Sequence, residues 1–177
     1  MVRKIIILAI ISVCILLTFG RFKLSHYTDN ENPELDTYHF LIKHDFTSIQ
    51  ACAIMATIKL ESNFDCTTCT TEGNTEYGLF QWSLNRKENL TQFASDINKP
   101  IDELETQLLF FLEELNPNSE YYSILNYNGY EWNDFLEASS PSKAAKIFCI
   151  IYIKPYFLTD LEMRTQLAEV YYSAYNH

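Results

Sequence analysis

Helical segments that carry their own start signals recur along this 177-residue chain and constrain its fold more than any other feature. Thr47 and Gln50 have capping-box spacing at the start of a helix over residues 48–62, and Pro141 opens another that runs to about residue 152. Further helices are expected over residues 35–44, 85–97, 100–115, 132–137 and 160–175. The one strand signal is the aromatic segment 77–82, typical of one arm of a small hairpin. The sequence therefore predicts an α+β domain that is predominantly α-helical.

Two of these helices have specific predicted starts. Asn85, with Glu88 three residues later, is expected to cap the helix over residues 85–97. Pro100 is expected at the first position of the next helix, whose apolar residues fall on one face, namely Leu104, Leu108, Phe111 and Leu115.

Residues 1–20 are typical of an export element. Two basic residues precede an apolar run over residues 5–19, which suits a cleaved signal or an uncleaved membrane anchor. Basic residues on both flanks of the run favour the anchor. Residues 21–33 are expected to form a polar tether and residues 34–177 one folded domain. The protein is thus expected to be secreted or anchored by a single span, with its domain outside the cytoplasm.

Four cysteines follow the export element and form an even set, which in an exported chain predicts two disulfides. Of the three ways to pair them, Cys52 with Cys149 and Cys66 with Cys69 is favoured, because the second pair lies in one short loop. A zinc site or a redox pair is the alternative, but the chain has neither a second CxxC motif nor a spaced pair of histidines. No metal or cofactor is expected.

Charge limits the partners of the chain. Thirteen Lys and Arg against 23 Asp and Glu give a net charge of −10, and without residues 1–20, which hold two basic residues and no acidic one, it is −12. Such a domain repels phosphate backbones, so nucleic acid is not an expected partner. The four glycines form no phosphate-binding loop, and the four histidines do not cluster in sequence.

Glu61 is the sharpest candidate for chemistry. It stands near the end of the 48–62 helix, seven residues after Ile54 and three after Ile58, so it continues the apolar stripe that these two residues form. Apolar surroundings disfavour ionisation and raise the pKa of a carboxyl, as a general acid near neutral pH requires. The alternative is a solvated Glu at the rim of the stripe.

Two short elements around this residue resemble the signature of lysozyme-like muramidases. They are Leu60-Glu61-Ser62-Asn63-Phe64 and, after a loop, Glu76-Tyr77-Gly78-Leu79-Phe80-Gln81-Trp82. From about residue 38 to 175 the chain further resembles the phage tail lysozyme family, through Arg86-Lys87, Leu90, Phe93-Ala94, Gln107-Leu108, Glu114-Leu115, Phe148, Tyr152 and Pro155.

The resemblance implies a lysozyme-like helical domain with a small hairpin lining a cleft, and cleavage of β-1,4 linkages between the amino sugars of peptidoglycan. Glu61 would be the general acid. Tyr77 and Gln81 would hydrogen-bond the sugars, while Trp82 would either stack on a sugar or pack beneath the hairpin. Glu76 would be the second carboxylate, as nucleophile or charge stabiliser.

Several alternatives accompany this interpretation. Asp65 and Glu72 are further candidates for the second carboxylate. Ile153 stands where the family usually has a Glu, in Tyr152-Ile153-Lys154-Pro155. That loss and the acidic surface favour an inactive glycan-binding or structural surface protein as the first alternative. A lytic transglycosylase, which needs only one Glu, is the second, and chitin is the alternative polymer.

Overall fold

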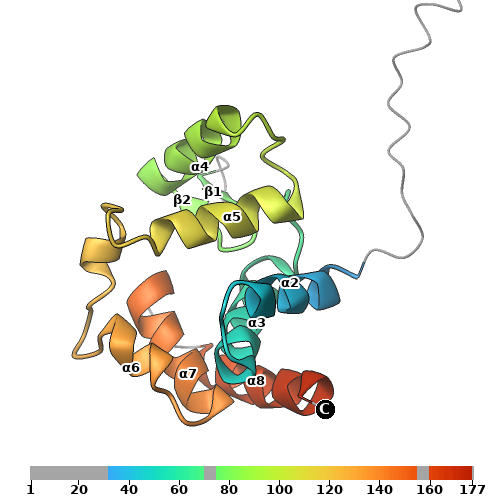
Figure 1. The fold of residues 1–177 in the computed structure, drawn as a ribbon, viewed down its shortest axis with the longest axis vertical. Coiled ribbons are helices and arrows are strands. Elements are labelled where there is room, and N and C mark those ends of the chain that lie inside the picture. The colour runs from blue at the N-terminus through green and yellow to red at the C-terminus, as the bar shows by residue number, and fades with distance from the viewer. Residues whose placement is uncertain (1–31, 70–74, 155–159, 177) are drawn as a thin grey trace, which may run out of the picture. The chain divides into compact units, whose positions relative to one another are not determined.

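The computed structural model describes residues 32–69, 75–154 and 160–176, which form a mostly helical α+β fold as predicted (Figure 1). Residues 1–31 and Glu72 lie outside this part. The α-helices in it are α2 (Pro33–Lys43), α3 (Ser48–Ser62), α4 (Asn85–Asp96), α5 (Leu104–Glu114), α6 (Trp132–Leu136), α7 (Pro141–Phe148) and α8 (Leu161–Tyr175). Two short helices of other types are η2 (Tyr122–Ile124), a 3-10 helix, and η3 (Cys149–Ile153), a π-helix. None of the described helices is long and apolar enough to span a bilayer.

Helix α3 is the centre of the core. Thr47 accepts a hydrogen bond from the backbone of Gln50, whose side chain accepts one from the backbone of Thr47, so the predicted capping box is confirmed. Ten of its 15 residues are buried, and it packs chiefly against α7 and α8. Figure 1 shows these three helices in one half of the domain and α4, α5 and the strands in the other. Burial on nearly every side fixes the position of the end of α3 that carries Glu61.

A small hairpin is present, but the prediction that residues 77–82 form one of its arms is wrong, because these residues span its turn and one residue of each arm. Strands β1 (Glu76–Tyr77) and β2 (Trp82–Ser83) are antiparallel, with Glu76 opposite Ser83 and Tyr77 opposite Trp82. The four residues between them form a tight turn, in which Gly78 and Gln81 have φ values of +72° and +49°. The positive φ of Gly78 ends β1 after two residues, and Leu84, with a φ of +48°, directly follows β2.

Gln107 on α5 holds the hairpin turn against the rest of the domain. Its buried amide nitrogen donates to the backbone oxygens of Cys66 and Ile101, at 2.9 and 2.8 Å, and its Oε1 accepts from Leu79 N at 2.8 Å. A buried amide satisfied in this way connects three separate loops.

The predicted cap of α4 and the predicted start of α5 are wrong. The N-cap of α4 is Leu84, which makes no side-chain capping bond, and Asn85 lies inside the helix. Helix α5 begins at Leu104 instead of Pro100, because the Gln107 amide holds the carbonyl of Ile101 in the preceding turn. By contrast, α7 begins at Pro141 as predicted, with Ser140 as its N-cap.

The predicted disulfides are also wrong, because the structure has Cys52, Cys66, Cys69 and Cys149 as free thiols. Cys66 is buried whereas Cys69 is exposed, so the two side chains of the short loop lie in different environments. Cys52 lies within electrostatic reach of Glu169 near the end of α8, while Cys149 lies within reach of Arg164 near its start. Cys52 and Cys149, the other predicted pair, therefore lie near different residues of α8.

Gly78 is expected to be essential for stability. A Cβ at this position would overlap Oε1 of the buried Gln107, in addition to the strain of a positive φ. The Gly78→Ala substitution should lower the free energy of unfolding by about 3 kcal/mol, measured by chemical denaturation. Gly129→Ala is the matched control, since Gly129 has a φ of +81° but no atom within 4 Å of the place that a Cβ would occupy. It should cost only the backbone strain of about 1 kcal/mol, and equal losses would contradict the role given to Gln107.

Candidate functional site

Glu61 lies at the end of α3, where its carboxyl is largely shielded from water. Its side chain is 16% exposed, and Ile54 and Ile58 on the same helix are fully buried. Asn63 ends the helix in a left-handed conformation, and the hydroxyl of Ser62 donates to Leu79 O at 3.1 Å. The end of α3 is thereby attached to the hairpin turn.

Arg164 on α8 binds Glu61 directly. Its Nη2 donates to Glu61 Oε1 at 2.6 Å and its Nη1 donates to Thr57 O at 3.4 Å, with only 6% of the Arg164 side chain exposed. No local signal in the chain indicates this pair, since the two residues are 103 positions apart and Arg164 belongs to no recognised motif. A buried arginine paired with a carboxylate is well suited to holding that carboxylate in one orientation.

The pKa of Glu61 is raised above its ordinary value, chiefly because burial disfavours the charged form. Arg164 opposes this by attracting the carboxylate, and the negative charges of Glu76 and Asp160 raise the pKa further. The net direction is the one that a general acid requires, although the ion pair with Arg164 was not expected. Glu61 therefore combines a raised pKa with a neighbouring cation that stabilises the carboxylate form.

The three predicted site residues Glu76, Tyr77 and Gln81 have different surroundings in the hairpin. Glu76 on β1 is half-buried and near enough to Glu61 for its charge to raise the pKa of that carboxyl. Tyr77 is half-buried, with Lys87 Nζ 5.6 Å from the centre of its ring. The amide nitrogen of Gln81 donates to Gly78 O at 2.8 Å and to the loop carbonyl Thr68 O at 3.1 Å, so Gln81 holds the hairpin turn.

Trp82 and Asp65 are engaged elsewhere. Trp82 is fully buried and packs beneath the hairpin, which is the second of the two places considered for it. The carboxylate of Asp65 accepts hydrogen bonds from the hydroxyl and backbone of Thr67, which lower its pKa. Asp65 therefore stabilises its own loop. Among the described residues, no set of three or more His, Cys, Asp and Glu is placed to hold a metal ion.

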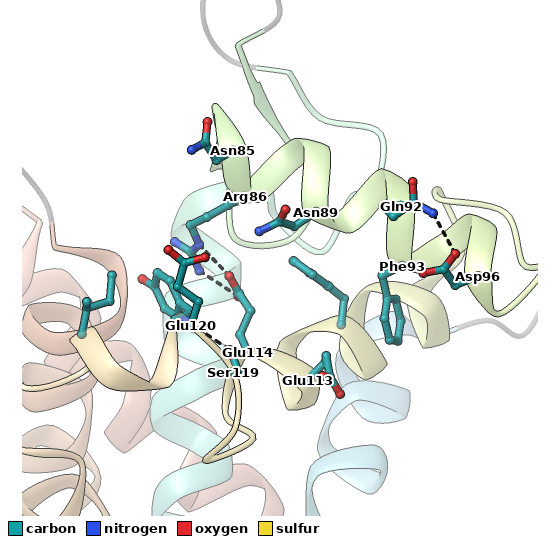
Figure 2. Close-up of a pocket in the computed structure, with 13 residues that line it drawn as sticks. Asn85, Arg86, Asn89, Gln92, Phe93, Asp96, Glu113, Glu114, Ser119 and Glu120 are labelled. Atoms are coloured by element: carbon teal, nitrogen blue, oxygen red, sulfur yellow. Dashed lines mark hydrogen bonds and ion pairs between the residues drawn. The ribbon is translucent and has the colours of Figure 1, made fainter.

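A groove of about 570 Å³ lies between α4 and α5 and continues to the turn before η2 (Figure 2). It is lined by Asn89 and Phe93 from α4, Phe110 and Glu113 from α5, and Glu120 and Tyr121 from the turn, among others. Glu61, Glu76 and Arg164 are not among its lining residues, so this groove is separate from the carboxylates at the end of α3.

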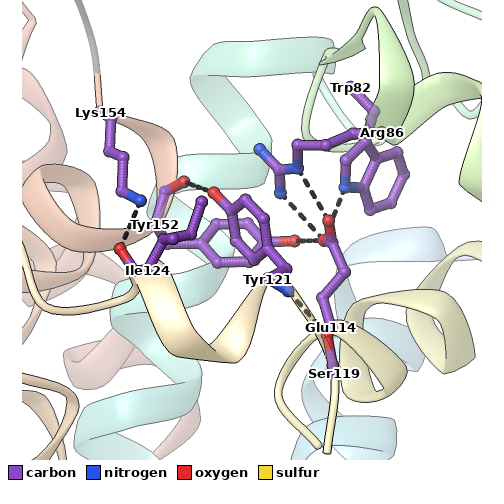
Figure 3. Close-up of polar contacts among 8 residues, drawn as sticks. All are labelled: Trp82, Arg86, Glu114, Ser119, Tyr121, Ile124, Tyr152 and Lys154. Carbon is purple, nitrogen blue, oxygen red and sulfur yellow. Dashed lines mark hydrogen bonds and ion pairs between the residues drawn. The ribbon is translucent and has the colours of Figure 1, made fainter.

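Glu114, at one side of this groove, is the centre of a buried polar cluster (Figure 3). Its carboxylate accepts two hydrogen bonds from Arg86, at 2.7 and 2.9 Å, one from Trp82 Nε1 at 2.9 Å, and one from the hydroxyl of Tyr152. The guanidinium of Arg86 also stacks 4.0 Å from the centre of the Tyr121 ring. Since Glu114 is 4% exposed, these donors satisfy a carboxylate that would be costly to bury alone.

Ile153, the departure from the family pattern, lies in η3 and packs partly buried against the core. The next residue, Lys154, donates from Nζ to Ile124 O and lies 5.2 Å from the centre of the Tyr121 ring. Nearby, Arg86 forms its ion pair with Glu114. The C-terminal end of η3 is therefore held by Lys154, which lies over the Tyr121 ring, and by the hydrogen bond from Tyr152 to Glu114.

The raised pKa of Glu61 predicts how this residue affects stability. A carboxyl whose pKa is higher in the folded state than in the unfolded chain destabilises the fold when it is ionised. This cost disappears when the pH falls below the pKa that the carboxyl has in the unfolded chain. Glu61→Gln mimics the protonated form, so at pH 7 it should raise the midpoint of thermal unfolding, and the gain should vanish toward about pH 4. Asp65→Asn is the matched control with the opposite sign, because the pKa of Asp65 is lowered. It should lose stability at pH 7 and approach the wild type only as the pH falls through the folded pKa of Asp65. A destabilised Glu61→Gln at pH 7 would contradict the net effect of burial.

Comparison with known proteins identifies the family of this chain. No curated protein matches the chain. Residues 32–175 match the phage tail lysozyme family, a range that runs from the N-cap of α2 to the last residue of α8 and includes both Glu61 and the Glu114 cluster. The resemblance in the Glu61 and Tyr77-Gly78 elements is thus part of a match over nearly the whole described structure. The chain belongs to the phage tail lysozyme family.

Proposed function

We propose that this protein is a peptidoglycan hydrolase that cleaves β-1,4 linkages between amino sugars, with Glu61 as general acid. Membership of the phage tail lysozyme family supports lysozyme-like hydrolysis of peptidoglycan. The observation that carries the finer proposal is the Glu61 carboxyl, which is shielded at the end of the buried helix α3 and has a raised pKa. The export element over residues 1–20 supports action outside the cytoplasm.

In the proposed reaction the protonated carboxyl of Glu61 donates its proton to the glycosidic oxygen as the bond to the anomeric carbon breaks. The carboxylate left behind accepts the hydrogen bond from Arg164, which lowers the cost of forming that charge in a shielded site. Glu76, whose charge already acts on Glu61, would stabilise the positive charge on the sugar ring or attack the anomeric carbon. Water then completes hydrolysis. Tyr77 is the candidate hydrogen-bonding partner of the sugar, and Gln81 positions the hairpin.

Loss of activity in Glu61→Gln tests this proposal. With purified insoluble peptidoglycan, the full-length wild type should release reducing ends, and Glu61→Gln should reduce the rate by at least about 100-fold. Glu137→Gln removes an exposed carboxyl in the same way and should keep the wild-type rate.

Two other results would assign the protein differently. Binding of peptidoglycan without release of reducing ends by the wild type would favour an inactive glycan-binding or structural protein. Products with anhydro ends, seen by mass spectrometry, would indicate a lytic transglycosylase. Chitin run in parallel identifies the preferred polymer.

The pH dependence of the rate should follow the charges around Glu61. The rate should fall as the pH rises through the pKa of Glu61, because the acid must hold its proton. Arg164→Gln removes the cation that lowers this pKa and should move the alkaline limb of the pH–rate profile to higher pH. Glu76→Gln removes a charge that raises the pKa and should move the limb of its residual activity to lower pH. Shifts in the same direction, or an unmoved limb in both variants, would mean that Glu61 is not the group that titrates.

A further inference from the structure

The groove between α4 and α5 has no part in the reaction proposed above, yet its size is that of a small-molecule site. Its volume of about 570 Å³ lies within the range of ligand pockets. Its long wall is α4, where the lining residues run from Asn85 to Asp96, a length of about 16 Å. Figure 2 shows this row of side chains along α4 above α5.

The charge in this groove is negative. Asp96 at the end of α4, Glu113 at the end of α5 and Glu120 in the following turn are exposed and line it from three separate elements. Arg86 is the cation among the lining residues, and its charge is matched by the bidentate bond to Glu114. The groove therefore attracts cations and repels phosphate and carboxylate ligands.

The other lining groups suit a sugar. Phe93, which is half-buried, provides apolar ring surface between the helices, and the buried ring of Phe110 lies behind it with the ring centres 5.6 Å apart. Asn85 and Asn89 place amide donors and acceptors along the α4 wall, while the amide of Gln92 donates to Asp96 Oδ1 at 2.7 Å and leaves its oxygen as an acceptor. Aromatic surface flanked by amides and carboxylates matches a pyranose ring, which has an apolar face and a rim of hydroxyl groups.

We propose that this groove binds a glycan segment whose sugars carry free amino groups, as in a chain of glucosamine units without N-acetyl groups. The ammonium groups would pair with Asp96, Glu113 and Glu120, the hydroxyl groups would bind the amides of α4, and a ring face would lie on Phe93. A lysine side chain would use one carboxylate and leave the amide wall without partners. A neutral sugar would leave the three carboxylates without cations. A sugar with free amino groups therefore satisfies more of the polar groups in the groove than a lysine side chain or a neutral sugar does.

The test measures binding by calorimetry at about pH 5.5. It uses the full-length chain made in bacteria, which leaves Asn89, in the glycosylation sequon Asn89-Leu90-Thr91, without N-glycans. Glu61→Gln is present throughout to prevent turnover. Three probes are compared, namely the glucosamine trimer, the N-acetylglucosamine trimer and Nα-acetyl-lysine amide. Backbone amide shifts of Asn89 and Phe93, against those of Tyr77, identify the groove as the binding site.

The glucosamine trimer should bind and shift Asn89 and Phe93, with an affinity that falls as salt is added. The triple variant Asp96→Asn, Glu113→Gln, Glu120→Gln should weaken this binding by about tenfold. A matched triple variant of exposed acids outside the groove, Glu88→Gln, Glu137→Gln and Glu162→Gln, should leave it unchanged.

Three results would overturn the proposal. One is equal weakening in the two triple variants, which would indicate only a general effect of net charge. Another is equal binding of the N-acetylated trimer in the groove, and the third is tighter binding of the lysine amide there. Since Glu61 is already inactive in these proteins, none of these results bears on the reaction proposed for that residue.

Discussion

The buried carboxylate of Glu114 connects the two halves of the domain. Its hydrogen-bond donors are Trp82 from the hairpin, Arg86 from α4 and Tyr152 from η3, so one carboxylate holds these three elements together. An unpaired charge at this depth would cost several kcal/mol, roughly 3 to 5 when one partner is removed, so these elements must stay together for the fold to persist. Because the hairpin is fixed in this way, Glu76 on β1 stays near Glu61 on α3.

The pKa of Glu61, on which its proposed role depends, is set by two opposing effects. Burial at the end of α3 favours the neutral acid, whereas Arg164 favours the carboxylate, and burial is the larger effect. A more exposed Glu beside the same arginine would lose its proton at low pH and could not act as an acid near neutrality. A buried Glu without the arginine would have a still higher pKa. Arg164 therefore lowers a pKa that burial alone would raise further.

Local signals predicted the parts of this structure that depend on neighbours in sequence. The capping box at Thr47, the start of α7 at Pro141 and the placement of Glu61 near the end of a helix all follow from spacing over a few residues. The wrong start of α5 arose because the Gln107 amide binds a carbonyl six residues earlier, which no cap preference reveals. Arg164, the Glu114 cluster and the free cysteines depend on contacts between distant segments, and an even number of cysteines cannot report which side chains face one another.

The π-helical turn η3 determines where the two ends of this segment point. Lys154 N donates to Cys149 O five residues earlier, so the turn holds one residue more than an α-helical turn would. Cys149 thereby faces the Glu61–Arg164 pair while Tyr152 reaches Glu114. A one-residue deletion here would rotate everything beyond it by about 100° and detach Tyr152 from the cluster. The π-helical length of η3 and the carboxylate of Glu114 therefore depend on each other. A chain that loses one of them needs a different hydrogen-bonding partner for the group that remains.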